Sequence, residues 1–541
     1  MKKILFSVSA FMLPALMFGQ TAIDAYNLSQ SDFKGTARFM SMGGAFTSLG
    51  GDLSTLNQNP AGIGVYRSSE IGVTLGLDIA STKSSNGAFS ISKNKTTFNC
   101  NNFGYIGAVY TGSDVMPYFN WGASYSRVAD FNRAYKGKGA MTGSLSNYIA
   151  GYTSAESWNS EDLTAYDSFN PYMEPMGAPW MSILAYNSYL INPTGATSYS
   201  GLWNNKTSGE MTFDVHEKGY TDEYSINFGG NFANIVYWGM GFGITDIYYR
   251  SSVYYTEDMS NATIPSLDAN NNYVGTRDGG AGFGLDSWKS ISGSGFNFKI
   301  GTIIKPINEL RIGLAVHTPT YYNLKQEGWA GVDYGYNPNI EGFVQTNDGY
   351  ADYFEWKLRT PWRLLTGISG VIGKKAIVSL DYEYRPMQNM TVKDQNGRNW
   401  TDVNDDVKTY YNAMSIVRVG AEYRLSPQWS VRAGYQIQTS PSTTVALNGE
   451  TPVFTSGPDD TETTPSYSFD KSTQYISFGL GYRYKSFYVD AAYVNKQRES
   501  QWRAFTPNDY TKVGNNYPES SPHSKINLSS NQIVLSLGVK F

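Results

Sequence analysis

The residues of this chain whose types suit acid–base or metal chemistry are few and far apart. The three histidines are His216, His317 and His523, and none belongs to a zinc-protease or nucleophile motif. The single cysteine, Cys100, excludes a paired-cysteine zinc site and a disulfide framework. We therefore expect no catalytic residues, no metal site and no cofactor, and interpret the protein as a non-enzyme.

An acidic stretch near residue 400 has the oxygen ligands that calcium prefers. Its members are Asp394, Asn396, Asp402, Asn404, Asp405 and Asp406. The spacing of glycine and glutamate that defines an EF-hand loop is missing. We interpret the stretch as a solvated turn, and calcium binding there stays open.

Basic side chains recur on one parity of several predicted strands, the parity that we expect to face inward. They are Lys299, Arg311, His317, Arg363, Arg418 and Arg432. Guanidinium groups bind carboxylates bidentately, so this set is a candidate carboxylate-binding surface. The alternative is a network of salt bridges with the interleaved Asp381, Glu383, Glu422 and Asp490. His317 has the further alternative of ligating haem or a metal.

Strands must position these side chains, and the C-terminal one is the clearest. Ile533, Leu535, Leu537, Val539 and Phe541 share one face, opposite small or polar residues such as Ser536 and Gly538. Similar segments lie at 69–82, 102–111, 117–130, 222–233, 235–249, 291–304, 309–323, 355–372, 375–386, 413–425, 428–439, 474–485, 487–497 and 530–541. Their connections alternate between short turns and long loops, such as 260–285.

This pattern predicts an all-β fold, a transmembrane antiparallel β-barrel of fourteen strands. Aromatic residues make up 15% of the chain, with 42 tyrosines, as expected for the interfacial girdles of such a barrel. After the N-terminus, no run reaches the roughly 18 apolar residues of a membrane helix. The net charge of −4 and the scattered Lys and Arg argue against a nucleic-acid partner.

The N-terminal part divides into two predicted segments. Residues 1–19 have two lysines and an apolar run, which is typical of a secretory signal peptide. Residues 20–67 are rich in glycine yet carry apolar side chains that need cover, so we predict a plug inside the barrel formed by residues 68–541. The longest predicted outer loop covers residues 131–221.

That loop contains a predicted amphipathic helix at residues 179–191. Trp180, Ile183 and Leu184 lie at helical spacing after Pro179, a residue suited to a first turn. One interpretation is that the helix caps the barrel mouth by packing against its own loop. The other is that the three side chains are exposed and form the capture surface for a hydrophobic ligand.

The plug segment carries a resemblance to a known family. In GTARFMSMGGAFTSLGGDLSTLNQNPAGI, the residues Arg38, Gly43, Gly44, Asn59, Pro60, Ala61 and Gly62 resemble the plug motif of the FadL/TodX family of outer-membrane transporters for hydrophobic compounds. HTPTYYNL (317–324), TPWRLLTGIS (360–369), VSLDYEYRP (378–386) and RVGAEYRLSPQWSVRAGYQIQTSP (418–441) resemble strand segments of its members from the Bacteroidetes.

The resemblance implies a location in the outer membrane of a Gram-negative bacterium and passive uptake of long-chain fatty acids or other hydrophobic compounds. In the family, cargo leaves sideways into the bilayer, which implies that Asn59-Pro60-Ala61 lies beside residues 119–130, with Gly122 as a candidate lateral gate. Relatives also suggest two alternatives, a haemin-binding receptor or a non-transporting scaffold or shuttle, as in type IX secretion.

Further partners follow from the expected location. A final aromatic residue on the last strand, Phe541, resembles the signal that the barrel-assembly machinery recognises. Lipid of the outer membrane is expected around the wall, and we expect a monomer.

Overall fold

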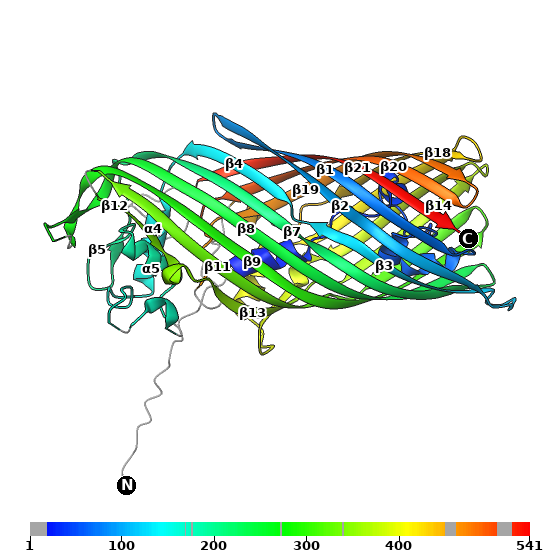
Figure 1. The fold of residues 1–541 in the computed structure, drawn as a ribbon, viewed down its shortest axis with the longest axis horizontal. Coiled ribbons are helices and arrows are strands. Elements are labelled where there is room, and N and C mark those ends of the chain that lie inside the picture. The colour runs from blue at the N-terminus through cyan, green and yellow to red at the C-terminus, as the bar shows by residue number, and fades with distance from the viewer. Residues whose placement is uncertain are drawn as a thin grey trace, which may run out of the picture.

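The protein is a long antiparallel β-barrel (Figure 1). The computed structural model describes residues 19–167, 169–174, 177–270, 273–337, 340–448, 461–505 and 522–541. The predicted signal peptide lies outside these residues except for Gly19. The continuous wall strands are β1 (Glu70–Asn86), β2 (Phe89–Tyr110), β7 (Ser208–Phe232), β8 (Val236–Leu267), β9 (Tyr273–Ile307), β17 (Ala413–Arg424), β18 (Trp429–Gln438), β19 (Tyr467–Tyr484), β20 (Phe487–Arg503) and β21 (His523–Lys540).

Four further wall strands are interrupted, and each is built from two pieces. The pieces are β3 (Tyr118–Asp130) with β4 (Arg133–Ala140), β10 (Leu310–His317) with β11 (Tyr321–Tyr336), β13 (Asp352–Arg359) with β14 (Arg363–Ile372), and β15 (Ala376–Pro386) with β16 (Thr391–Asp394). Pro319 and Pro361 lie in two of the gaps, as expected for a residue that cannot donate to a strand ladder. Over the described residues, the wall therefore has the predicted fourteen strands.

The barrel closes between its first and last strands. β21 pairs with β20 on one side and β1 on the other, from Glu70 opposite Lys540 to Ser85 opposite Lys525. Beyond this ladder, the N–H of Ser69 donates to the carbonyl of Phe541 at 2.9 Å, and the N–H of Phe541 donates to the carbonyl of Ser69 at 3.0 Å. We call the half of the barrel that carries the short turns the lower barrel and the other half the upper barrel. Among the described residues, closure leaves no unpaired sheet edge in the lower barrel.

The outer surface of the lower barrel is apolar on every strand, and β8 shows its extent. Val236, Trp238, Met240, Phe242 and Ile244 follow one another on the outward parity. Their inward neighbours are mainly small, including glycines 239, 241 and 243. This apolar belt spans about nine residues, the length that a tilted strand needs to cross a bilayer.

Above the belt the two faces exchange their character. Outward positions of β8 become polar from Asp246 onwards, whereas the inward Ile247, Val253, Tyr255 and Met259 are buried. The adjoining β9 changes in the same way. The prediction of a loop at 260–285 was wrong over most of this range. There, β8 continues to Leu267 and β9 starts at Tyr273, and the two strands are paired up to these residues.

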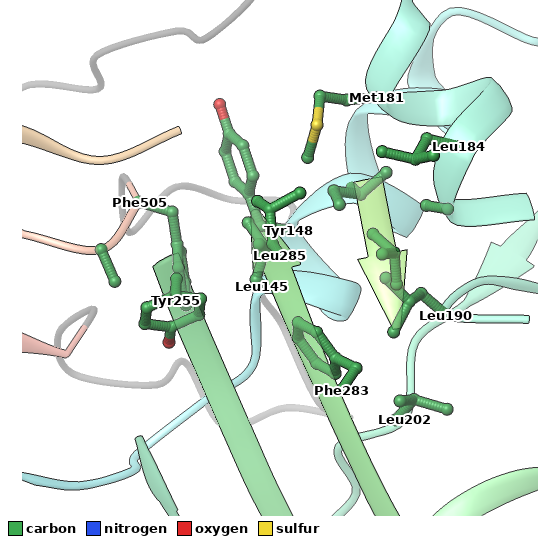
Figure 2. Close-up of a cluster of buried hydrophobic side chains, with 14 of the residues drawn as sticks. Leu145, Tyr148, Met181, Leu184, Leu190, Leu202, Tyr255, Phe283, Leu285 and Phe505 are labelled. Carbon is green, nitrogen blue, oxygen red and sulfur yellow. The ribbon is translucent and has the colours of Figure 1, made fainter. Parts of the chain in front are cut away.

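A compact cap fills the upper end of the barrel. It contains α4 (Leu145–Ala155), η2 (Pro171–Met173), α5 (Trp180–Asn187), β5 (Asn192–Pro193) and β6 (Tyr199–Ser200), and β12 (Ile340–Gln345) and η3 (Thr346–Gly349) adjoin it. Figure 2 shows Leu145 and Tyr148 of α4 beside Leu285 of β9, and Leu184 beside Met181 on α5; all belong to one buried cluster. The predicted loop 131–221 is shorter in the structure, because β4 and β7 extend the wall to residues 140 and 208.

The N-terminal segment lies inside the barrel (Figure 1). It forms α1 (Gly19–Ser29), α2 (Ala37–Ser41), α3 (Thr55–Gln58) and η1 (Pro60–Val65). α1 packs against α6 (Thr401–Tyr410) from an outer loop that folds inward, and that loop begins with η4 (Met387–Asn389). α7 (Thr444–Asn448) packs beside α6. Among the described residues, no helix is long and apolar enough to cross a membrane.

Candidate functional site

The plug and the wall meet through glycines on both sides. Gly43 has φ of +62°, and a Cβ there would lie 2.8 Å from the backbone of Tyr435 and of Val419. On the wall, a Cβ at Gly434 would lie 2.0 Å from the nitrogen of Gly43. Only glycine fits at such a backbone-to-backbone approach. A Cβ at Gly44 would lie 2.8 Å from the Phe33 ring of the plug and 3.3 Å from the Arg418 side chain of the wall, so the predicted Gly-Gly element lies where plug and wall meet.

Arg38 joins α2 to the wall by charge. Its Nε lies 2.9 Å from Oε2 of Glu422 on β17, and its guanidinium lies 5.2 Å from the centre of the Phe46 ring. Glu422 is also bound by Arg432. Arg38, the first charged residue of the plug motif, is therefore held in a structural ion pair with the wall.

The Asn-Pro-Ala corner lies against β8 and β9. The Asn59 side chain donates to the carbonyls of Thr47 at 2.6 Å and Thr302 at 3.3 Å, and accepts from the N–H of Ala61 at 3.1 Å. A Cβ at Gly239 of β8 would lie 2.2 Å from the carbonyl oxygen of Pro60. Gly62 completes the turn by donating to the carbonyl of Asn59.

The predicted contact of this corner with residues 119–130 therefore needs correction. The plug reaches β3 through the next turn, where Asn120 donates to the carbonyls of Ile63 at 2.7 Å and Tyr66 at 2.9 Å. A Cβ at Gly122 would lie 3.4 Å from Cδ1 of Ile63. The Asn-Pro-Ala corner contacts β8 and β9, and the contact with β3 comes one turn later, so the sequence of the motif alone does not tell which strand it meets.

The prediction of weak pairing at Gly122 was also wrong. It lies opposite Ile106 of β2 and Asn227 of β7 in regular register. The irregularity of β3 is a β-bulge at Val128, between the pairs Arg127 with Asp222 and Ala129 with Thr221. Pairing with β2 stops just before it, at Ser126.

The bulge redirects backbone towards the plug. The N–H of Asp32 donates to the carbonyl of Val128 at 2.8 Å, and the N–H of Asp130 donates to the Asp32 carboxylate at 3.0 Å. Lys496 of β20 binds the same carboxylate at 2.5 Å. A wall strand that has lost one neighbour is thus paired with the plug instead.

A basic cavity of about 90 Å³ lies beside the bulge, between plug and wall. Glu383 is fully buried there and is shared by three guanidinium groups: Arg363 at 2.7 Å, Arg385 at 2.5 Å and Arg418 at 2.5 Å. Nη1 of Arg418 is buried without a hydrogen-bond partner. One carboxylate offsets only one of three positive charges, so this cluster keeps a net positive charge that a second carboxylate would offset.

Four of the six predicted lumen residues come together here. Lys299, Arg363 and Arg418 line the cavity, and His317 lines an adjoining one of about 60 Å³. Lys299 is ion-paired with Glu223. Arg385 was missed, although the alternation of Asp381, Glu383 and Arg385 on β15 marks all three as inward.

The other predicted lumen residues differ from this set. Arg311 and Arg432 line a separate cavity at the end of the barrel that carries the short turns. His317 is buried, and its Nε2 lies 2.9 Å from the carbonyl oxygen of Gln58, so that nitrogen is already engaged by the plug.

The predicted capture surface is wrong as an exposed surface. Trp180 is 3% exposed, and Ile183 and Leu184 are 0% exposed. All three belong to the core of the cap, which agrees with the capping interpretation. Periodicity marked their shared face correctly but did not tell whether ligand or protein covers it.

The acidic stretch forms local bonds. Asp394 is bound by Arg398 at 2.6 Å, and the Asn404 side chain bonds the backbone of Val392 in both directions. Within the described ranges, no group of three or more His, Cys, Asp or Glu side chains is arranged to hold a metal ion.

Comparison with solved structures identifies the fold. The chain is similar to a Pseudomonas aeruginosa FadL homologue over 94% of its own length and 99% of the other chain, with a TM-score of 0.50 and 12% identity. The toluene transporters TodX of P. putida and TbuX of Ralstonia pickettii align over the same 94% of this chain and 99% of theirs, with TM-scores of 0.45 and 0.43 and identities of 13% and 14%. The sequence matches no protein-family model and no curated protein.

Proposed function

We propose that this barrel is an outer-membrane channel for hydrophobic compounds that carry a carboxylate, such as long-chain fatty acids, and that the cargo leaves sideways into the bilayer. The observation that carries this proposal is the basic cavity beside the Val128 bulge. There, a site for a carboxylate adjoins the place where the wall has exchanged one neighbouring strand for the plug. The fold shared with a FadL homologue supports the same class of function.

The apolar belt supports an outer-membrane location, because only lipid would cover such a surface. A lateral exit follows from the chemistry of the cargo. Each buried methylene of an acyl chain contributes about 0.8 kcal/mol, so a tail of about sixteen carbons is strongly disfavoured in water. An exit beside Val128 would deliver the tail from the lumen directly to lipid.

The cavity beside the bulge is small, and transport would require movement. The cavity of about 90 Å³ is smaller than the roughly 300 Å³ at which small-molecule pockets begin. The bonds between Asp32 and the bulge and the packing of α6 on α1 are the contacts that must open. We place the gate there, with the plug remaining inside the barrel.

The small size of this cavity also favours one alternative, a non-transporting outer-membrane scaffold or shuttle. Mass spectrometry of the barrel purified in native membrane discs separates the two. Fatty acid that co-purifies with the wild type and is lost in Arg418→Gln supports the channel. An empty barrel, together with no uptake of labelled oleate by cells that express it, would favour the scaffold.

A further inference from the structure

A second cavity, of about 270 Å³, lies under the plug at the end of the barrel with the short turns. On the side of the plug it is lined by Leu49, Gly50 and Gly51. Its basic side chains come from both plug and wall: Arg38, Arg311, Arg424, Arg432, Arg483 and Lys540. In the orientation that short turns indicate, this cavity opens to the periplasm.

Three of these six cations have carboxylate partners. Glu422 binds Arg38 and Arg432, with Asp490 as a second partner of Arg432, and Lys540 binds Glu70 at 2.8 Å. In the part of the chain that the structure describes, Arg311, Arg424 and Arg483 have no carboxylate within ion-pair distance. The cavity therefore carries more positive than negative charge.

Arg311 is the most informative of the unpaired cations. Its Nη1 donates to the carbonyl of Leu49 at 2.6 Å, which fixes the guanidinium against the plug. Its Nε is buried and has no hydrogen-bond partner. Arg311 also lines the cavity and has no carboxylate partner, so an oxyanion bound there would offset its charge.

We propose that this cavity is a binding site for a small, soluble oxyanion of the periplasm that bears phosphate or carboxylate groups. The size of the cavity corresponds to on the order of nine water molecules, enough for phosphate or a compact polycarboxylate. Bound there, the anion would join plug to wall, because Arg38 belongs to the plug and Arg311, Arg424 and Arg483 to the wall.

Two sources offer such oxyanions, free solutes and lipid headgroups. The inward-facing Ser369 and Gly481 line the cavity, whereas their strand neighbours Ile368 and Leu480 are exposed on the apolar belt. This placement favours a solute that enters from the open end of the barrel. The proposal does not depend on what the channel transports, because the basic cavity at Glu383 lies on the other side of the plug.

The test is calorimetric titration of the full-length barrel in zwitterionic lipid discs with inorganic phosphate and with citrate, at constant ionic strength. We expect saturable binding of at least one of them and a rise in the unfolding temperature. Arg311→Gln should weaken binding about tenfold or more, as for the loss of one charge-assisted hydrogen bond. Arg424→Gln with Arg483→Gln should weaken it further.

The matched control is Lys375→Gln, which removes one exposed positive charge from the same end of the barrel without lining the cavity. Heat-modifiable migration checks that each variant is folded. Wild-type protein that binds neither anion would overturn the proposal, as would equal weakening by Lys375→Gln. A higher unfolding temperature in discs that contain anionic lipid, without binding of phosphate or citrate, would also overturn the proposal. The basic cavity would then be assigned to lipid headgroups.

Discussion

The backbone N–H of Asp32 in the plug donates to the carbonyl of Val128 in the wall at 2.8 Å, at the one residue where β3 bulges away from regular pairing with β7. The plug thus forms a backbone hydrogen bond with β3 just beyond the point where its pairing with β2 ends. In the lateral exit proposed above, opening this bond would expose an unpaired section of β3 while the other contacts of the plug hold it inside the barrel.

Deletion of Val128 should abolish uptake while leaving assembly intact. Without this residue, Arg127 opposite Asp222 is followed directly by Ala129 opposite Thr221, so β3 pairs regularly and the bulge disappears. Uptake of labelled oleate by expressing cells measures the effect. The matched control deletes Asp114 from the exposed turn before β3. Normal uptake by the Val128 deletion would rule out an exit at this bulge.

Arg418→Gln should weaken binding of a fatty acid but not of the corresponding fatty alcohol. Arg363 and Arg385 still pair Glu383 in this variant, so the wall keeps its network. Loss of a charge-assisted bond of about 1.5–3 kcal/mol should reduce affinity for the carboxylate roughly 10- to 100-fold. Fluorescence competition with oleate and oleyl alcohol measures both. Equal losses for the two ligands would argue against carboxylate recognition.

Deletion of the last strand should prevent assembly, and Phe541→Ala should impair it. β21 is hydrogen-bonded on both sides, so without it β1 and β20 would present unpaired backbone to lipid. Phe541→Ala keeps the backbone bonds to Ser69 and tests the terminal aromatic ring alone. The measurement is heat-modifiable protein in the outer-membrane fraction, and folded protein from the strand deletion would contradict a closed barrel.

Leu184→Ala should loosen the cap at a cost of about 2–5 kcal/mol, because its side chain is fully buried in the cap core. Hydrogen exchange of α4 and α5 should rise, while the strands of the apolar belt stay protected. The control is Met173→Ala, since this side chain is 67% exposed. Unchanged exchange in α5 would mean that the core does not hold the cap in place.

The cap should be more stable at pH 5 than at pH 8. Glu257 lies above the apolar belt, and burial raises its pKa from 4.5 to about 7. Its carboxyl is bonded by the N–H of Leu145 at 2.9 Å, the hydroxyl of Tyr255 at 2.7 Å and Ser144, which joins the start of α4 to β8. A raised acid pKa favours the protonated form in the folded state.

The stability from Glu257 should therefore fall as pH rises from about 4.5 through about 7, by about 3 kcal/mol in total. Hydrogen exchange of α4, corrected for intrinsic rates, measures this slope. Glu257→Gln keeps a hydrogen-bonding side chain without a titrating proton, so it should remove the slope. A slope that persists in this variant would assign the pH dependence to another group.

Much of the barrel could be predicted because alternation is a local signal. In β21 the outward Ile533, Leu535 and Leu537 are exposed and the inward Val534 and Ser536 buried, as expected. The alternation rule failed where the outer face of the barrel passes from the apolar belt to a polar surface. On β8 the apolar parity is outward at Ile244 and inward at Ile247, so a search for lipid-facing residues ends the strand too early.

The candidate site was predicted only in part, for a different reason. Parity told which basic residues face inward, but it did not tell on which side of the plug they lie. Arg311 and Arg418 have equivalent patterns, yet the plug separates their cavities. The bulge at Val128 has no glycine or proline to mark it in the sequence. Its hydrogen-bond partner, Asp32, lies nearly a hundred residues earlier in the chain, so no local pattern predicts it.

The cap core has a consequence for the order in which the protein folds. Its central residues come from the loop between β4 and β7, yet Trp502, Phe505 and Ile526, from the last two strands and the segment between them, complete it. Contacts between residues more than three hundred positions apart form late, because a long stretch of chain must first be brought together. The cap can therefore reach its final packing only once β20 and β21 are in place. The time at which α4 becomes protected from proteolysis should accordingly report the last step of barrel closure.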